Sequence, residues 1–343
     1  MWCWSSASGS GPWSRDGGVR STVDGLIPPA IPVSVEFYPT IGSEVGPLAF
    51  SADGRTLVFA DRGNQGLEAW DLTRGQRISS PRFGLVEHLA MDSRAEVVAT
   101  TAYRFPLRVW QVGDGFDLTA VTLTDQPTVN ATDGGPVALS ADGTTVAAVT
   151  SGGVALWDLA TGARSDLRGS GVTALAFAPD GRLAVAQGGS VSIWRGLEKT
   201  RTISGLPVPA TALTFSHDGE LLVVGGADGD TSFLWVYDER GPRLSLDQIG
   251  PVASVSISAD GALVAVGLAN GSGADEDAPA VRLWSVATGK GMSMHINDAG
   301  AADNTALRCH KDAAVDNFVA FSPVEPRLAV GCRSGVRIWR LSY

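Results

Sequence analysis

Cysteine and histidine, from which many cross-links and active sites are built, are scarce in this sequence. Its 343 residues include three cysteines and four histidines. Cys3, Cys309 and Cys332 lie far apart in the chain, and so small and odd a set argues against a disulfide framework and fits a reducing cytoplasm. The histidines, at positions 88, 217, 295 and 310, lie in no recognisable nucleophile, general-base or phosphate-loop motif. We therefore expect a cytoplasmic protein that is not an enzyme.

Long apolar runs and a surplus of positive charge are also missing. Although 44% of the residues are hydrophobic, no apolar run approaches the length of about 18 residues that a membrane-spanning helix needs. The chain has 26 basic and 36 acidic residues, a net charge of −10. Such a balance argues against binding to nucleic acid or to an anionic membrane through bulk electrostatics. We expect a soluble monomer with no cofactor.

What the sequence does contain is a repeated four-residue pattern: an aliphatic residue, any residue, a small or aliphatic residue, then Trp or Tyr. The copies end at Trp70, Trp110, Trp157, Trp194, Tyr237, Trp284 and Trp339. Successive copies are spaced by a mean of about 45 residues. A period of this length, built on short apolar runs, is typical of a β-propeller.

An equally regular turn precedes most of these copies. Asp-Gly stands between two apolar runs in the turns that begin at Ser51, Ser140, Ala178, Ser216 and Ser258, and this is a strong signal for a β-hairpin. In the second and seventh units the same place holds Asp92-Ser93-Arg94 and residues 323–326, where we expect longer or proline-set turns. Each unit is thus predicted to form four strands. In the third unit these fall at about 136–139, 144–149, 154–159 and 163–167.

The two ends of the chain predict how the ring closes. Only four residues follow Trp339, too few for a fourth strand in the last unit. Residues 33–38 alternate between apolar and polar side chains and can complete that unit, which removes an exposed sheet edge. We therefore predict an all-β, seven-bladed β-propeller of four-stranded antiparallel blades over residues 33–343. A disordered Ser-, Gly- and Pro-rich tail is expected over residues 1–32, either as a true start or as the remnant of a fusion to a catalytic domain.

The chain resembles the tryptophan-aspartate (WD) repeat family over all but its first thirty or so residues. The family's Trp-Asp pair stands at Trp70-Asp71 and Trp157-Asp158, with Tyr237-Asp238 as a near match. No copy has an Asp six residues before the aromatic residue, where the family has its turn Asp, and only residues 309–312 resemble the Gly-His-x-Asp that leads into a family blade. We expect a divergent member supported mainly by apolar packing between blades. The Ala-, Gly- and Asp-rich composition indicates a bacterial source.

The resemblance implies a scaffold that binds a protein partner, of unknown identity, through the loops on one face of the ring. In the family this face holds the loops that join the second strand of a blade to the third, and those that join successive blades. The matching residues here are Arg62, Asn64, Gln65, Tyr103, Arg104, Phe105, Gln187, Asp228, Asp230 and Arg333. Aromatic and Arg side chains are common in binding hot spots, which favours residues 103–105, although a lone aromatic loop often packs onto its own neighbour. The alternative is a propeller enzyme, or a small-ligand or ion-binding protein, with its site at the central channel.

Two insertions interrupt the regular spacing and contain metal-ligand residue types. Asp275, Glu276 and Asp277 lie in a Gly-rich loop and could bind Ca²⁺ through oxygen atoms, but their spacing matches no calcium-loop motif. Cys309 and His310 are too few for a structural zinc site, which needs four ligands. We therefore expect solvated connections at both places and no bound metal.

Overall fold

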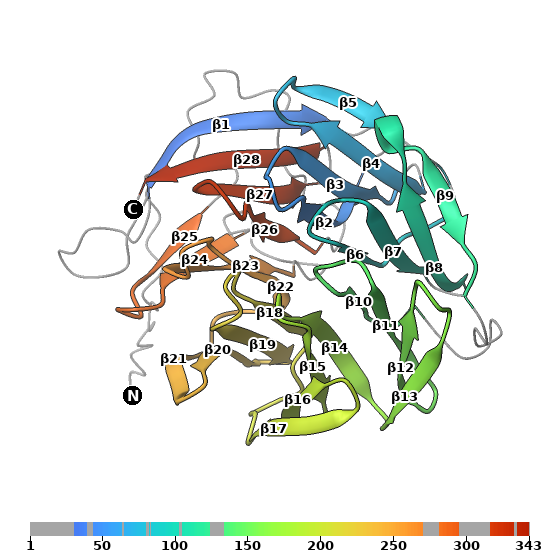
Figure 1. The fold of residues 1–343 in the computed structure, drawn as a ribbon. Coiled ribbons are helices and arrows are strands. Elements are labelled where there is room, and N and C mark those ends of the chain that lie inside the picture. Colours follow the sequence, from blue (N-terminus) through green and yellow to red (C-terminus); the bar gives the residue numbers. More distant parts are fainter. Residues whose placement is uncertain are drawn as a thin grey trace, which may run out of the picture.

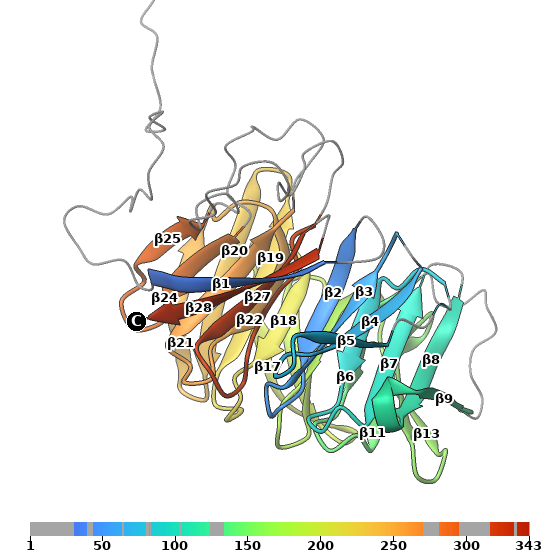
Figure 2. The same ribbon diagram turned by 90° about the horizontal axis from the view of Figure 1, so that it is seen from above.

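The computed structural model describes residues 31–39, 44–63, 65–79, 82, 84–102, 105–123, 134–269, 281–294, 316–332 and 335–342 of the chain. These residues form seven four-stranded antiparallel sheets arranged as the blades of a ring (Figure 1). Seen from the side, the strands run between the two faces of the ring (Figure 2). The prediction of an all-β, seven-bladed propeller is confirmed.

The blades follow one another along the chain, and the first strand of each lies nearest the centre of the ring (Figure 1). Blade 1 consists of β2 (Val45–Phe50), β3 (Thr56–Asp61), β4 (Gly66–Asp71) and β5 (Gln76–Ser79). Blade 2 consists of β6 (His88–Met91), β7 (Val97–Ala102), β8 (Phe105–Val112) and β9 (Leu118–Val121), with the short 3-10 helix η1 (Asp114–Phe116) before its last strand. Blade 3 consists of β10 (Val137–Leu139), β11 (Thr145–Thr150), β12 (Gly153–Asp158) and β13 (Arg164–Arg168). Blade 4 consists of β14 (Val172–Phe177), β15 (Arg182–Gln187), β16 (Ser190–Arg195) and β17 (Glu198–Ser204). Blade 5 consists of β18 (Ala212–Phe215), β19 (Leu222–Asp228), β20 (Thr231–Asp238) and β21 (Gly241–Asp247). Blade 6 consists of β22 (Val252–Ile257), β23 (Leu263–Leu268), β24 (Val281–Ser285) and β25 (Gly291–Met294). Blade 7 is β26 (Val319–Phe321), β27 (Arg327–Cys332), β28 (Gly335–Ser342) and β1 (Ile31–Pro39).

Blade 7 takes its outermost strand from the N-terminal part of the chain. β1 pairs antiparallel with β28, in a register that runs from Ile31 opposite Ser342 to Pro39 opposite Gly335. β26 at the other side of the blade contacts β2 of blade 1, so the ring is closed. The predicted closing strand is confirmed, and it begins two residues earlier and ends one residue later than the sequence indicated. Of the tail predicted over residues 1–32, Ile31 and Pro32 belong instead to β1, and the remainder lies outside the described residues and stays a prediction.

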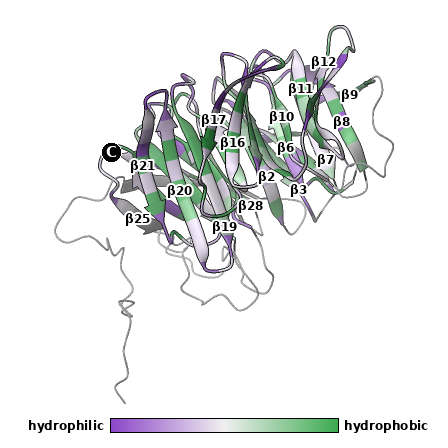
Figure 3. Ribbon diagram, turned by 90° about the horizontal axis from the view of Figure 1, so that it is seen from below, coloured by the Kyte–Doolittle hydropathy of each residue, from purple (hydrophilic) through white to green (hydrophobic). Residues whose placement is uncertain are grey.

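In the described part of the chain the hydrophobic core forms seven clusters of buried side chains, each shared by two neighbouring blades. The strand β23 illustrates why strands in this fold are apolar on both faces. Leu263 and Ala265 pack against blade 7, while Val264 and Val266 between them pack against blade 5, because successive side chains point to opposite faces of a strand. Hydrophobic residues accordingly follow the strands, and hydrophilic ones gather at the turns (Figure 3).

The repeated aromatic residues and the Asp that follows some of them have separate roles. Trp157 and Trp339 are 0% and 1% exposed, and both lie within clusters shared by two blades. Asp71 follows Trp70 and binds the next turn, since its Oδ1 accepts hydrogen bonds from Thr73 N at 2.9 Å and Thr73 Oγ1 at 2.6 Å. In this Trp-Asp pair a buried core residue is therefore followed directly by a residue that stabilises the turn before the outermost strand.

The turn between the first two strands recurs with the same hydrogen bonds. In blade 1 Ser51 Oγ accepts from Thr56 N at 2.9 Å and donates to Asp53 Oδ1 at 2.6 Å, while Gly54 has a φ of 67°. The longer turn expected in blade 2 is wrong, because residues 92–97 form a turn of the same length. There Asp92 Oδ1 replaces the Ser hydroxyl, accepting from Glu96 N and Val97 N at 2.8 Å each, and Ala95 has the positive φ, 57°.

Candidate functional site

The loops that join second to third strands lie on the same face of the ring as the starts of the first strands, because the first and second strands of each blade are antiparallel. We call this the loop face. The partner-binding residues predicted from the sequence come from blades 1, 2, 4, 5 and 7. Asn64, Tyr103, Arg104 and Arg333 lie outside the described residues. The other six can be placed.

Four of these six have exposed side chains on three blades. They are Gln65 in blade 1, Phe105 in blade 2, and Asp228 and Asp230 in blade 5. Phe105 is 40% exposed, and the guanidinium carbon of Arg108 lies 5.0 Å from the centre of its ring. This contact combines an aromatic ring with a cation at the edge of the loop face.

Gln187 is committed to the fold. Its Nε2 donates a hydrogen bond to Ser170 O at 2.6 Å, so the side chain ties the second-to-third loop of blade 4 to the connection from blade 3. The side chain of Arg62 contacts residues of two blades. Its Nη1 lies 2.9 Å from Glu44 Oε1, and its guanidinium carbon lies 5.3 Å from the centre of the Phe318 ring.

These contacts bring together the starts of the innermost strands of three blades, near the centre of the loop face (Figure 1). Glu44 precedes β2 of blade 1, Phe318 precedes β26 of blade 7, and His88 begins β6 of blade 2. Burial, aided by the positive charge of Arg62, lowers the pKa of His88 to about 4, although a hydrogen bond to the backbone of Gly134 opposes both effects. We call Glu44, Arg62, His88 and Phe318 the central cluster.

The central cluster has no net charge near neutral pH, because Glu44 neutralises Arg62 and the imidazole is uncharged. Its unmet hydrogen-bonding capacity lies in Arg62, whose Nε has no hydrogen-bond partner among the described residues. Sequence reasoning selected Arg62 but missed Glu44, His88 and Phe318. These three residues could have been found from the sequence, because each lies at the start of the first strand of a blade or just before it.

The described residues contain no group of three or more His, Cys, Asp or Glu side chains that could hold a metal ion. Both clusters that the sequence singled out for metals, residues 275–277 and 309–310, lie outside the described ranges, so the expectation there stays a prediction. No helix in the described part of the chain is long and apolar enough to span a membrane.

A groove of about 330 Å³ lies between blades 4 and 5. It is bordered by the first-to-second turn of blade 5 and the third-to-fourth turn of the same blade, and it therefore opens on the face opposite the loop face. Its apolar lining is Ile193, Ile203, Phe215, Leu222 and Tyr237. Its charged lining is Arg182, Arg195, Arg201, Glu220, Asp238 and Glu239.

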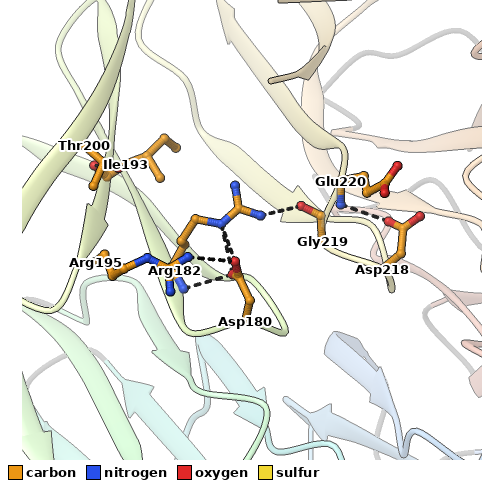
Figure 4. Close-up of polar contacts among 8 residues, drawn as sticks. All are labelled: Asp180, Arg182, Ile193, Arg195, Thr200, Asp218, Gly219 and Glu220. Atoms are coloured by element: carbon orange, nitrogen blue, oxygen red, sulfur yellow. Dashed lines mark hydrogen bonds and ion pairs between the residues drawn. The ribbon is translucent and has the colours of Figure 1, made fainter. Parts of the chain in front are cut away.

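Two arginines of blade 4 cross the groove to backbone carbonyls of blade 5. Arg182 Nη2 donates to Gly219 O at 2.7 Å while its Nε donates to Asp180 Oδ2 at 2.7 Å (Figure 4). Arg201 Nη1 donates to Asp238 O at 2.7 Å. Asp180 also accepts a hydrogen bond from Arg195 Nη2 at 3.1 Å (Figure 4).

Electrostatics at the groove favour the ionised form of Asp180 and the neutral form of Tyr237. Burial alone would raise the pKa of Asp180, but hydrogen bonds from Arg182 and the positive charges of Arg182 and Arg195 hold it below its usual value. Burial raises the pKa of the Tyr237 hydroxyl, an effect that the charge of Arg201 opposes. The groove thus contains ionised side chains beside a neutral phenol. Sequence reasoning did not find this groove. The available signal was Tyr237, the one repeated aromatic position that does not hold Trp.

Comparisons with known proteins agree with the repeat pattern and the fold. Residues 164–195 and 198–232, from the outermost strand of blade 3 into blade 5, match the family described as WD domain, G-beta repeat. An uncharacterized WD repeat-containing protein of Schizosaccharomyces pombe is 30% identical over 79 residues, which cover 23% of this chain and 15% of that protein. The composition's indication of a bacterial source finds no support in this fungal relative.

A solved structure covers almost the whole ring. The β-propeller domain of Cps50 (Swd1) from Myceliophteria thermophila superposes with a TM-score of 0.66 over 90% of this chain and 100% of that one, at 14% sequence identity. At this identity the likeness shows the fold alone. The chain is therefore a seven-bladed β-propeller in which two segments, within blades 3 to 5, are recognised by sequence as WD repeats.

Proposed function

We propose that this protein is a noncatalytic scaffold that binds a protein partner through its loop face. The main support is the display of Gln65, Phe105, Asp228 and Asp230 by loops of three different blades on one face of a closed ring. Loops on a rigid scaffold are where recognition concentrates. The similarity to WD-repeat proteins points the same way, since that family generally serves protein interaction. A monomeric state and a cytoplasmic location belong to the same proposal.

The surface has the composition of a recognition site. Phe105 and Arg108 provide an aromatic and a guanidinium group, which are common in hot spots, while Asp228 and Asp230 add exposed negative charge. Phe105 is half-exposed, and it lies against Arg108 and beside the backbone of Gly84. A ring held in place in this way loses little side-chain entropy when a partner covers it.

The test is a pull-down from the native source with chemical cross-linking, comparing three forms of the protein. Wild type and Arg55→Ala should recover the same partner, because Arg55 is exposed in a turn on the opposite face. Phe105→Ala combined with Asp228→Lys should reduce recovery at least tenfold without lowering the melting temperature. Equal recovery by all three forms, or cross-links confined to the opposite face, would reject the loop-face proposal.

One observation favours a second candidate function, a small-ligand site at the central cluster. Arg62 Nε is a buried donor without a hydrogen-bond partner among the described residues, and it lies beside a neutral His88. A ligand with an acceptor atom there would raise the melting temperature by mass action. A metabolite screen by thermal shift, repeated with Arg62→Lys, distinguishes this function from the scaffold. A shift with turnover, and no partner in the pull-down, would favour it.

A further inference from the structure

The groove between blades 4 and 5 leaves part of the hydrophobic core accessible. Ile193 and Ile203 of blade 4 belong to the buried cluster shared by the two blades, and Phe215 and Tyr237 of blade 5 pack against it while only partly buried. Apolar surface inside a concavity favours an apolar ligand group, because covering it releases water. A volume of about 330 Å³ is at the lower end of the range for ligand sites, about 300 to 1,000 Å³.

The opening coincides with a departure from the repeat. Six of the seven aromatic positions hold Trp, and blade 5 has Tyr237, which lines the groove. Tyr has a single phenol ring where Trp has the two fused rings of indole, so a smaller side chain occupies this position in blade 5. Replacement of Tyr237 by Trp is therefore expected to fill part of the groove.

The walls of the groove are held in place before any ligand binds. Arg182 is fixed by Asp180, by Gly219 O and by the Phe215 ring, whose centre lies 5.7 Å from its guanidinium carbon. Arg201 is fixed by Asp238 O. Preorganised groups lose less entropy on binding. Because both arginines bond across the gap between blades, the groove does not depend on a mobile loop.

Among the charged side chains that line the groove, Arg201 is the one that favours an anionic ligand group. Asp180 is shared by Arg182 and Arg195, and the half-buried Arg201 bonds a carbonyl, which does not neutralise it. The carboxylate of Asp238 is directed to the turn that follows it, where it accepts from Arg240 N at 2.7 Å and Gly241 N at 2.9 Å. Glu220 and Glu239 are exposed, and solvent and salt screen such charges strongly.

We infer that this groove is a second binding site, on the face opposite the loop face, for a peptide segment of a partner protein that has an acidic side chain next to an aliphatic one. The aliphatic side chain packs on Ile203, Phe215 and Tyr237, and the carboxylate pairs with Arg201. A carboxylate and a guanidinium form charge-assisted hydrogen bonds, which are stronger than neutral ones.

The experiment selects heptapeptides from a random phage-displayed library on the wild-type protein, with prior depletion on the Tyr237→Trp variant. Tyr237→Trp restores the repeat residue and is expected to fill part of the groove. Each enriched peptide is then synthesised with a fluorescein label, and its affinity is measured by fluorescence polarisation. The variants are Tyr237→Trp, Arg201→Ala and the matched control Arg77→Ala, an exposed arginine on the outermost strand of blade 1.

We expect the enriched peptides to share an acidic residue adjacent to Leu, Ile or Val, and to bind at least tenfold more weakly to Tyr237→Trp and to Arg201→Ala. Arg77→Ala should bind like wild type, and thermal melting shows that each variant is folded. The inference is overturned if no peptide distinguishes wild type from Tyr237→Trp, or if those that do lack an acidic residue. Because the groove and the loop face are on opposite sides, either proposal can fail without the other.

Discussion

Ala95 has a backbone conformation that its side chain disfavours. Its φ of 57° lies in the left-handed region, where a Cβ atom costs about 1 kcal/mol, and the equivalent residues of other blades are Gly54, Gly143 and Gly219. We predict that Ala95→Gly raises the free energy of unfolding by about 0.5 to 1 kcal/mol in urea denaturation. Ala52→Gly is the control, since Ala52 lies in the same kind of turn without a positive φ, and it should give no gain. A loss of stability in Ala95→Gly would contradict the proposed strain.

His88 should make stability depend on pH between about 6.5 and 4. Because burial lowers its pKa to about 4 in the folded protein, the unfolded chain binds a proton first as the pH falls, and folding then loses up to about 3 kcal/mol. At pH 7 both states are neutral at this position, so nothing is lost there. The pKa values of Asp53, Asp142 and Asp218 are also lowered, but these carboxylates lose their contribution mainly below pH 4.

The measurement is urea denaturation of wild type and His88→Gln at pH 7.0, 6.0, 5.0 and 4.5. Wild type should lose stability steadily over this range, and His88→Gln should lose less, because glutamine does not titrate. Parallel curves for the two proteins would show that the histidine is accessible to protons in the folded state.

At the scale of strands, β1 is the element whose role is easiest to test. Removing residues 1–39 should expose the edge of β28 and lower the melting temperature of the whole protein, because the pairing from Ile31 to Pro39 is lost. Removing residues 1–28 should leave melting almost unchanged. A synthetic peptide of residues 29–42, added to the shorter protein, should restore stability in proportion to its concentration. Equal melting of the two truncated proteins would exclude closure by β1.

The strands were predictable from sequence because their determinants are local. Asp-Gly turns and the aromatic position recur at a fixed spacing, and in blade 3 the predicted strands agree with β10 to β13 to within one or two residues. The turn of blade 2 was mispredicted because Ala95 takes a conformation that the sequence alone associates with glycine.

The candidate sites were less predictable because they form between segments that are distant in the chain. Arg62 was found from its loop position, but its contact with Phe318 joins blades 1 and 7 and has no local signature. The groove likewise requires Arg182 of one blade to meet Gly219 of the next. A departure such as Tyr237 is visible in the sequence, but the groove that it lines becomes apparent only when the blades are packed.

At the scale of the whole molecule, the seven clusters of the core correspond to the seven interfaces between neighbouring blades, including the one between blades 7 and 1. In an open array of repeats the terminal units have one neighbour and can separate first. In this ring every blade has two neighbours. The closing interface contains Val45, Phe59 and Ile338, and its buried residues are of the same apolar kind as those of the other interfaces.

We therefore predict that the closing interface is as strong as an interior one. Ile338 in the interface of blades 7 and 1 and Ile193 in the interface of blades 4 and 5 both precede the repeated Trp, and they are 1% and 5% exposed. Ile338→Ala and Ile193→Ala should each cost about 2 to 5 kcal/mol and leave a single unfolding transition, measured in urea by tryptophan fluorescence and circular dichroism together. A much smaller cost for Ile338→Ala, or a second transition in that variant alone, would mean that the ring opens at blade 7 before the remaining blades unfold.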